Sequence, residues 1–397
     1  MHYDVIIIGA GIVGAATAWQ ITQQYPGKKV LMLEKEPQPA LHQTGRNSGV
    51  IHAGVYYPPD SLKARYCREG LQQTISFCQQ YQIPYLQCGK LLVACNEVEH
   101  QRMEALFKRC EQNLLTPVYL DAQQLQHKEP VIAGSGAIWI KQTGIVDYQQ
   151  VTQRMIDIAQ HNGCEIRYQH SVTAINEQPE QVVVCCAEKQ FYASTLVVCG
   201  GLMADRLITL SGLEPDFRII PFRGEYYQLA DKYNQLIEHL IYPIPDPALP
   251  FLGVHLTRMI NGTVTLGPNA VLAWQREGYN KGDFNLSDTL SMLGFSGFWP
   301  LVGRHAKSGL QELKNSLFKS QYLKLAQKYC PSLSLDDLRP YPSGVRAQAV
   351  SRRGELLHDF EFIQTRRCLH VGNAPSPAAT SSIPIAKAIV AKIEDKL

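Results

Sequence analysis

The first 34 residues constrain the fold most, because a strand, a glycine-rich turn, a helix and a second strand follow one another without interruption. Residues 3–9 read YDVIIIG, a continuous apolar and β-branched run typical of a parallel strand buried on both faces. Gly9, Gly11 and Gly14 then form the motif GAGIVG at the start of an Ala-rich helical segment, and the next strand, KVLMLE, ends at Glu34. This order predicts a βαβ unit of the Rossmann type.

The glycines and the glutamate of this unit each have a physical role in binding a dinucleotide. Gly9 permits a tight turn, Gly11 lets backbone amides approach a pyrophosphate, and Gly14 allows the helix to pack closely on the strand. The positive N-terminus of the helix faces the phosphates. Glu34 is placed to accept hydrogen bonds from the adenosine ribose, and its charge would repel a 2′-phosphate, which disfavours NADP. The motif by itself does not separate FAD from NAD.

Length and composition set the protein class. A chain of 397 residues predicts two domains and a core large enough to enclose a bulky cofactor. The net charge of +3, with no Lys/Arg run, argues against a nucleic-acid partner. Eleven cysteines without CxxC or zinc spacing predict free thiols in a reducing compartment and no metal site. With no signal peptide and no apolar stretch approaching about 18 residues, the sequence predicts a cytoplasmic protein. Peripheral contact with the inner face of the cytoplasmic membrane stays open.

The alternation of strands and helices predicts an α/β fold with a discontinuous cofactor domain. We expect the Rossmann-like domain to comprise residues 1–88, 145–215 and 335–397. Residues 89–144 and 216–334 are expected to form a second, α+β substrate domain on a mixed or antiparallel sheet. Helices are predicted near residues 61–81, 97–112, 148–161 and within 287–330.

Short motifs distributed along the whole chain carry a family resemblance. In order, they are TGRNSGVIHAGVYY, CGKLLVA, FRGEYYQL, GVHLTR, LGPNA, SGVRAQAV and NAPSPAATSS. Together they resemble the L-2-hydroxyglutarate oxidase/dehydrogenase branch of the D-amino-acid-oxidase-like FAD-dependent oxidoreductases. The resemblance implies that FAD is the dinucleotide. One departure is the pair Ala378 and Ala379, where relatives often have Gly.

The resemblance also implies which residues meet FAD. Residues 42–54 resemble the segment that runs alongside the flavin and ribityl chain, and Val172 matches the strand position whose backbone meets adenine. Gly200 and Gly201 match a turn on the pyrophosphate side, and residues 372–382 match the loop and helix start near the pyrimidine edge of the flavin. The full predicted cofactor set is Gly9, Gly11, Gly14, Glu34, Lys35, Thr44, Arg46, Asn47, Ser48, Gly49, Val172, Gly200, Gly201, Gly372, Ala379, Thr380 and Ser381.

Oxidising a 2-hydroxy acid requires a base for the hydroxyl proton and a cation for the carboxylate. A neutral imidazole is the common base near pH 7, and a guanidinium holds a carboxylate by two parallel bonds. His52 and His255 are the candidate bases, with the assignment between them open, and Arg346 matches the family's carboxylate clamp. His52 could instead anchor the flavin.

A 2-hydroxy dicarboxylate substrate needs a second polar site. The candidates for it are Tyr57, Lys90, Arg223, Tyr226 and Arg258. Each of them has the alternative of being a surface charge or a packing aromatic residue.

The function that the resemblance implies is oxidation of L-2-hydroxyglutarate to 2-oxoglutarate by hydride transfer to FAD, with oxygen or a quinone as electron acceptor. The alternatives are oxidation of an amino or N-methyl amino acid and a non-catalytic flavin-binding role. The segment GFSGFWP, followed by Lys307, Lys314 and Lys319, is either ordinary core or an interfacial patch facing a membrane.

Overall fold

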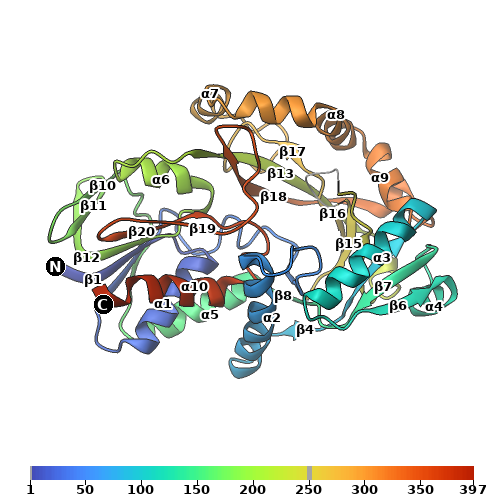
Figure 1. Ribbon diagram of the computed structural model, residues 1–397, viewed down its shortest axis with the longest axis horizontal. Helices are drawn as coiled ribbons and strands as arrows, with labels where there is room; N and C mark the ends of the chain where they lie inside the picture. The colour runs from blue at the N-terminus through green and yellow to red at the C-terminus, as the bar shows by residue number, and fades with distance from the viewer. Residues whose placement is uncertain (1, 248–252) are drawn as a thin grey trace.

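An eight-stranded mixed sheet forms one lobe of the protein and is built around β1 (His2–Ile8) and β12 (Lys189–Val198). The computed structural model describes residues 2–247 and 253–397 (Figure 1). The parallel strands run in the order β20, β12, β1, β2 and β9, and β10, β11 and β19 add antiparallel edges. The remaining strands are β2 (Val30–Leu33), β9 (Glu165–Arg167), β10 (Ala174–Glu177), β11 (Val182–Cys186), β19 (Glu361–Gln364) and β20 (Cys368–Asn373).

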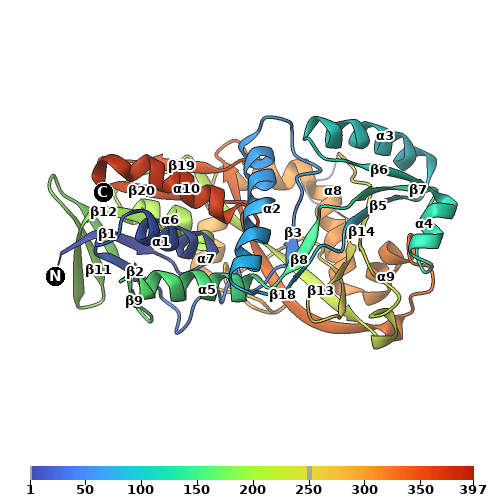
Figure 2. The same cartoon turned by 90° about the horizontal axis from the view of Figure 1, so that it is seen from below.

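Helices cover both faces of this sheet, which explains the continuous apolar run of β1. Val5 and Ile7 pack toward the face covered by α1 (Ile12–Gln24), α5 (Tyr148–His161) and α10 (Ser382–Ile393). Ile6 and Ile8 face the other way, where Leu207 of α6 (Ala204–Leu210) packs. The long helix α2 (Leu62–Gln80) packs on α10 beside the junction with the second lobe (Figure 2).

The second lobe is organised by a nine-stranded sheet. Its two longest strands, β13 (Phe217–Leu229) and β18 (Leu338–Ser351), pair antiparallel along nearly their whole length. Only the pair β14 and β5 is parallel among the pairings recorded for the described part of this sheet. The other strands are β5 (Lys90–Ala94), β6 (Val118–Asp121), β7 (Gly136–Ile140), β14 (Leu240–Pro243), β15 (His255–Arg258), β16 (Val264–Gly267) and β17 (Val271–Leu272).

The rest of the chain covers the second sheet and joins the lobes. The helices of this lobe are α3 (Glu97–Gln112), α4 (Ala122–Lys128), α7 (Leu286–Leu293), α8 (Phe298–Leu317) and α9 (Lys319–Gln327). A three-stranded sheet of β3 (Val50–Ile51), β8 (Gly144–Val146) and β4 (Tyr85–Leu86) lies at the junction. Single-turn helices are η1 (Gly201–Met203), η2 (Asp231–Tyr233), η3 (Leu335–Asp337) and η4 (Glu394–Lys396).

The predicted fold class, a Rossmann-like α/β unit with a second lobe on a mixed sheet, is confirmed. For the domain boundaries we propose one adjustment. Because β18 pairs with β13, the return to the cofactor domain belongs after residue 351 rather than at residue 335. All eleven cysteines are unpaired, as their spacing predicts. Across the described residues, no helix combines the length and the apolar character that crossing a bilayer requires.

Candidate active site

A cavity of about 720 Å³ lies between the two lobes. On one side it is lined by the carboxyl ends of β1, β2 and β12, the edge at which open α/β sheets bind ligands. On the other side it is lined by side chains of β13, β14, β15 and β18, and the C-terminal loop of residues 371–380 closes one end. The cavity therefore extends from the dinucleotide motif of the first lobe to the sheet of the second lobe.

The glycine motif leaves no room for side chains where α1 meets β1. Gly9 has a φ of +100°, a left-handed conformation that favours glycine. A Cβ on Gly14 would lie 2.0 Å from the carbonyl oxygen of Gly9, and a Cβ on Gly9 would lie 2.5 Å from that of Cys199. The motif therefore brings the helix and the two central strands into direct backbone contact.

The start of α1 is suited to a diphosphate. Gly11 caps the helix without a side-chain hydrogen bond, so the first turn presents backbone N–H groups toward the cavity. The Ile12 N–H donates to Oγ1 of Thr44 over 3.0 Å, which fixes the loop of residues 40–49 beside the turn. Glu34 is buried and accepts hydrogen bonds from the N–H groups of Ala10 (2.6 Å) and Glu36 (2.9 Å). These contacts hold its carboxylate at the end of β2, where a ribose would lie.

The opposite end of the cavity is organised by Thr380. Its hydroxyl accepts a hydrogen bond from the backbone N–H of His52 (3.0 Å) and lies 2.9 Å from the hydroxyl of Tyr148. Asn373 lines the same end, and its Oδ1 is buried with no hydrogen-bond partner. An unpartnered buried acceptor is costly, so this atom marks a position where a bound group would donate. The residues at both ends therefore fit a long dinucleotide such as FAD.

Most of the predicted cofactor residues line the cavity. Those that do are Gly9, Gly11, Glu34, Lys35, Thr44, Asn47, Ser48, Val172, Gly200, Gly201, Gly372, Ala379 and Thr380. Gly14, Arg46, Gly49 and Ser381 lie behind the lining. The guanidinium of Arg46 stacks 3.8 Å above the ring of Tyr279 and donates to the carbonyl of Leu41, so Arg46 holds the loop rather than facing the cavity.

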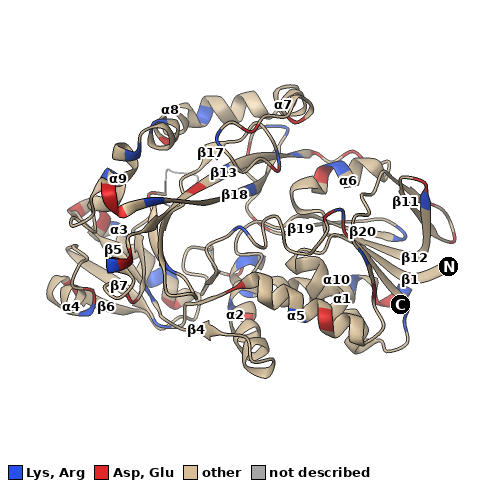
Figure 3. Ribbon diagram, turned by 180° about the vertical axis from the view of Figure 1, so that it is seen from behind, with Lys and Arg blue, Asp and Glu red and all other residues tan. Residues whose placement is uncertain are grey.

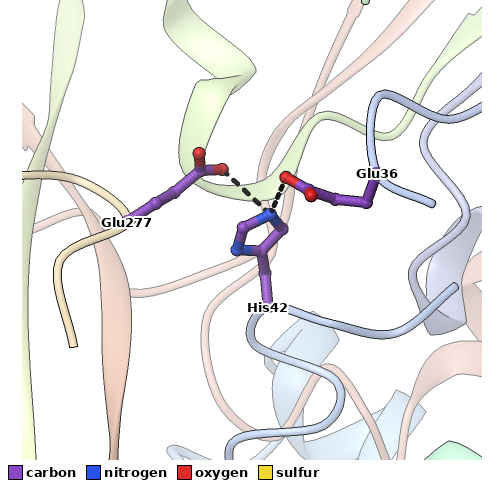
Figure 4. Close-up of side chains that lie close together, drawn as sticks. All are labelled: Glu36, His42 and Glu277. Carbon is purple, nitrogen blue, oxygen red and sulfur yellow. Dashed lines mark hydrogen bonds and ion pairs between the residues drawn. The ribbon is translucent and has the colours of Figure 1, made fainter. Parts of the chain in front are cut away.

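A polar clasp joins the two lobes above the dinucleotide end of the cavity (Figure 4). Nε2 of His42 lies 2.9 Å from Glu36 and 3.4 Å from Glu277, a residue of the loop between β17 and α7. Three such ligand atoms could hold a metal ion. However, the ammonium of Lys35 pairs with both carboxylates and already supplies the countercharge. We therefore interpret the cluster as a set of polar contacts that holds the loop of residues 273–285 against the first lobe, beside the cofactor cleft.

The two candidate bases both line the cavity as neutral imidazoles. Nδ1 of His255 donates to the carbonyl of Gly253 (3.0 Å), which leaves Nε2 as the acceptor, and the ring stacks on Tyr242 with centroids 3.7 Å apart. Burial lowers the pKa of His255 to about 3, and the charges on Lys90 and Arg346 add to the effect. Burial and then the charge on Lys90 lower the pKa of His52 well below its usual value. Both rings are therefore neutral near pH 7, and each keeps a ring nitrogen with a free lone pair.

Arg346 lines the cavity from β18, together with Tyr226 on β13 and Tyr57. The other three predicted cations lie elsewhere. Arg223 is buried in an ion pair with Glu225 (3.0 Å) and donates to the carbonyl of Asn280. Arg258 is three positions after His255 on β15 and so projects from the opposite face of the strand. The ammonium of Lys90 lies 4.0 Å from the ring centroid of Tyr242, behind the cavity wall.

Sequence reasoning missed two residues that line this part of the cavity. Tyr242 lies on β14 between His255 and Lys90, and only the pairing of distant strands brings it there. Lys63 lines the cavity from the first turn of α2, with its ammonium 5.5 Å from the ring of Tyr57. Its position at the start of the helix that follows the flavin-side segment was a signal that could have drawn attention to it.

Comparison with known proteins agrees with this site. The family described as FAD dependent oxidoreductase (DAO) matches residues 4–392, so the chain belongs to that family and is an FAD-dependent enzyme. It is 55% identical to an L-2-hydroxyglutarate dehydrogenase of Escherichia coli, covering 100% of this chain and 94% of the relative. It is 42% identical to a mitochondrial L-2-hydroxyglutarate dehydrogenase of Mus musculus, covering 98% and 88%.

Solved structures share the fold at lower identity. An L-alpha-glycerophosphate oxidase from Mycoplasma pneumoniae with FAD bound has a TM-score of 0.80 at 22% identity, covering 99% of this chain and 95% of that one. A glycine oxidase from Bacillus cereus has a TM-score of 0.73 at 19% identity, covering 100% and 96%. This chain therefore shares its overall fold with these oxidases.

Proposed function

We propose that this enzyme oxidises L-2-hydroxyglutarate to 2-oxoglutarate. The names and the full-length identity of its relatives support the substrate. The observation that carries the chemistry is the meeting of Arg346, His52 and His255 in one cavity next to the dinucleotide loops. When bound, FAD supplies a two-electron acceptor for the hydrogen on the carbinol carbon of the substrate.

The chain's own residues supply positioning and proton transfer. The guanidinium of Arg346 binds the carboxylate next to the hydroxyl by paired hydrogen bonds, which fixes the carbinol carbon in the cavity. One of the two neutral imidazoles accepts the hydroxyl proton, at Nε2 if the base is His255. Desolvation in the cavity strengthens both interactions, because few waters compete for the charged groups.

Replacing each histidine separately by asparagine should identify the base. Loss of the general base is expected to slow substrate-dependent flavin reduction by about 10²- to 10⁴-fold. Loss of a histidine that only shapes the cavity should instead raise the substrate concentration needed for half-maximal reduction and change the limiting rate little. Anaerobic stopped-flow measurements on His52→Asn and His255→Asn, each checked for full FAD content, make this distinction. Full limiting rates in both variants would exclude an imidazole base.

The second carboxylate of the substrate has two cations available to it. Lys63 lines the cavity, and Lys90 lies directly behind Tyr242. No ion pair to either ammonium is recorded among the described residues. The carboxylate of Asp359, which accepts a hydrogen bond from the backbone N–H of Lys63, lies close enough to raise the pKa of Lys63 and so offsets part of the effect of burial. Burial lowers the pKa of each lysine to about 8. We propose that these charges select a dicarboxylate over a monocarboxylate.

This charge should be visible in the pH dependence. Because a lysine is cationic only below its pKa, kcat/KM for L-2-hydroxyglutarate should fall as the pH rises through about 8. L-2-hydroxyvalerate, which lacks the second carboxylate, should show a smaller fall. Lys63→Met and Lys90→Met test each lysine separately. If the replaced lysine binds the second carboxylate, the kcat/KM values of the two substrates should become more similar, and the fall of kcat/KM above pH 8 should become smaller. An unchanged preference in both variants would contradict the assignment.

The proposed function is tested by anaerobic mixing of the yellow holoenzyme with candidate substrates. Bleaching by L-2-hydroxyglutarate, but not by sarcosine, proline or glycine, supports it. Bleaching by an amino acid alone would select the amino-acid alternative, and bleaching by none would indicate a non-catalytic flavoprotein. We propose that oxygen or a quinone reoxidises the reduced flavin. Measuring turnover with dissolved oxygen and with a short-chain quinone separates these two electron acceptors.

A further inference from the structure

One loop of the second lobe reaches across the cofactor cleft and contacts the first lobe at two places. We call this loop, residues 273–285 between β17 and α7, the strap, and a bridge between Trp274 and Phe284 closes its base. On one side Glu277 contacts the loop that follows β2, and on the other side Arg276 contacts α6, the helix that follows β12. Because β1 lies between β2 and β12 in the sheet, the strap crosses the carboxyl end of β1, where the glycine turn lies.

The attachment of the strap to α6 is buried and consists of several hydrogen bonds. Arg276 and Asp205 are each 2% exposed, and two nitrogens of the guanidinium donate to the two carboxylate oxygens, one of them over 2.7 Å. The guanidinium also donates to the carbonyl of Leu202 (2.9 Å), and the backbone N–H of Arg276 donates to Asp288 (2.8 Å). Figure 3 shows the adjacent acidic and basic residues of α6. Separating a buried pair of this kind would leave both charges desolvated, so this attachment is the fixed one.

The clasp, on the other side of β1, is more open to water. The side chains of Lys35, His42 and Glu277 keep 31%, 26% and 20% of their surface exposed. Tyr279 adds a hydrogen bond, with its hydroxyl 2.6 Å from Nδ1 of His42, and its ring lies beneath the guanidinium of Arg46. Ion pairs with this exposure contribute little stability, because water and salt compete for the same groups. The clasp can therefore separate while the attachment at α6 stays closed.

FAD has a shape that a closed strap would retain. Its two ends carry the bulky adenine and isoalloxazine rings, whereas the diphosphate between them is narrow. The start of α1 positions the diphosphate at the carboxyl end of β1, beneath the strap, and Glu34 and Thr380 lie toward the two ends of the cavity. A loop closed over the narrow middle retains such a ligand without contacts to either ring. Binding and release of FAD then require the strap to separate from the first lobe.

We propose that the clasp is a gate for FAD. Separation of Glu277 from Lys35 and His42 opens the cleft, and their pairing closes the strap over the bound cofactor. Arg223 donates to the carbonyl of Asn280 (2.9 Å) and keeps the tip of the strap on the second lobe, so opening separates the strap from the loop that follows β2. A gate slows both the association and the dissociation of FAD, whereas a side chain that only contacts FAD slows dissociation alone.

The gate is tested by the kinetics of FAD exchange. Glu277→Gln keeps the size of the side chain and removes the charge that pairs with Lys35. We expect the association and dissociation rate constants of FAD both to rise by about three- to tenfold, so that Kd changes less than either rate constant. Flavin fluorescence after mixing apoprotein with FAD gives the association rate. Trapping of released FAD by a second, tightly binding apoflavoprotein gives the dissociation rate.

A second variant and a control accompany this measurement. Tyr279→Phe removes the hydrogen bond to His42 and keeps the ring beneath Arg46, so both rate constants should rise by about two- to fivefold. Asp231→Asn breaks an exposed ion pair with Arg339 (3.3 Å) elsewhere in the second lobe and should exchange FAD as the unmodified protein does. Deuterium uptake by the apoprotein needs no cofactor, and the two sides of the clasp, residues 35–44 and 277–279, should exchange faster in Glu277→Gln.

Three results would overturn the proposal. Unchanged rate constants in both clasp variants would show that FAD does not pass the clasp. Faster dissociation with unchanged or slower association in Glu277→Gln would make Glu277 a contact of FAD and not part of a gate. Equal changes in Asp231→Asn would assign the effect to a general loosening of the second lobe. None of these outcomes depends on which substrate the enzyme oxidises, so they are independent of the proposed function.

Discussion

Gly14→Ala should give a colourless protein that does not retain FAD. The new Cβ would lie 2.0 Å from the carbonyl oxygen of Gly9, and both atoms belong to backbone that cannot move independently. Overpacking of this kind costs about 1–3 kcal/mol by itself. If α1 moved to relieve this clash, the backbone N–H groups that face the diphosphate would move with it. We expect the Kd for FAD to rise by roughly a hundredfold or more, which corresponds to about 2.7 kcal/mol.

The measurement is the flavin absorbance of the purified protein, followed by titration of the colourless protein with FAD monitored by flavin fluorescence. Gly282→Ala is a matched control, because no atom lies within 4 Å of a Cβ there. The control should remain yellow. A Gly14→Ala variant that retains stoichiometric, tightly bound FAD would contradict the proposal that the N-terminus of α1 binds the diphosphate.

Arg346→Met should lower kcat/KM for L-2-hydroxyglutarate by about 30- to 4,000-fold. Removing one partner of a desolvated, hydrogen-bonded charge pair costs roughly 2–5 kcal/mol. Methionine keeps much of the side-chain volume, so the loss reports the charge rather than a hole in the wall. Because the guanidinium positions the substrate, we expect a higher KM together with slower flavin reduction, while FAD stays bound.

Arg258→Met is the control for this experiment. It also removes a guanidinium from the substrate lobe, but on the face of β15 opposite His255. Its kcat/KM should change by less than about threefold, since surface substitutions away from a site usually fall within 0.5 kcal/mol. Unchanged kinetics in Arg346→Met, or equal losses in both variants, would contradict the carboxylate clamp.

The cofactor end could be predicted from the sequence because its geometry is local. Gly9, Gly11, Gly14 and Glu34 lie within one βαβ unit, and the hydrogen bonds of such a unit fix the positions of all four relative to one another. The family resemblance extended this reading to segments at residues 42–54 and 372–382, which the structure brings to the same cavity. The fold class followed for the same reason, since buried parallel strands have a distinctive apolar pattern.

The substrate end depended on tertiary structure, because its walls come from strands far apart in the chain. Arg223 and Arg258 carry the same charge as Arg346, yet Arg223 is paired with Glu225 and Arg258 faces away. The motif SGVRAQAV singled out Arg346 by family resemblance, whereas charge alone did not distinguish the three. Strand pairing alone placed Tyr242 against His255 and returned β18 to the second sheet. By itself, then, the sequence determined the dinucleotide unit, whose contacts are short in range. Only the packing of the second lobe decided that Tyr242 stacks on His255 and that Arg223 donates to Asn280, because those outcomes depend on contacts between distant segments.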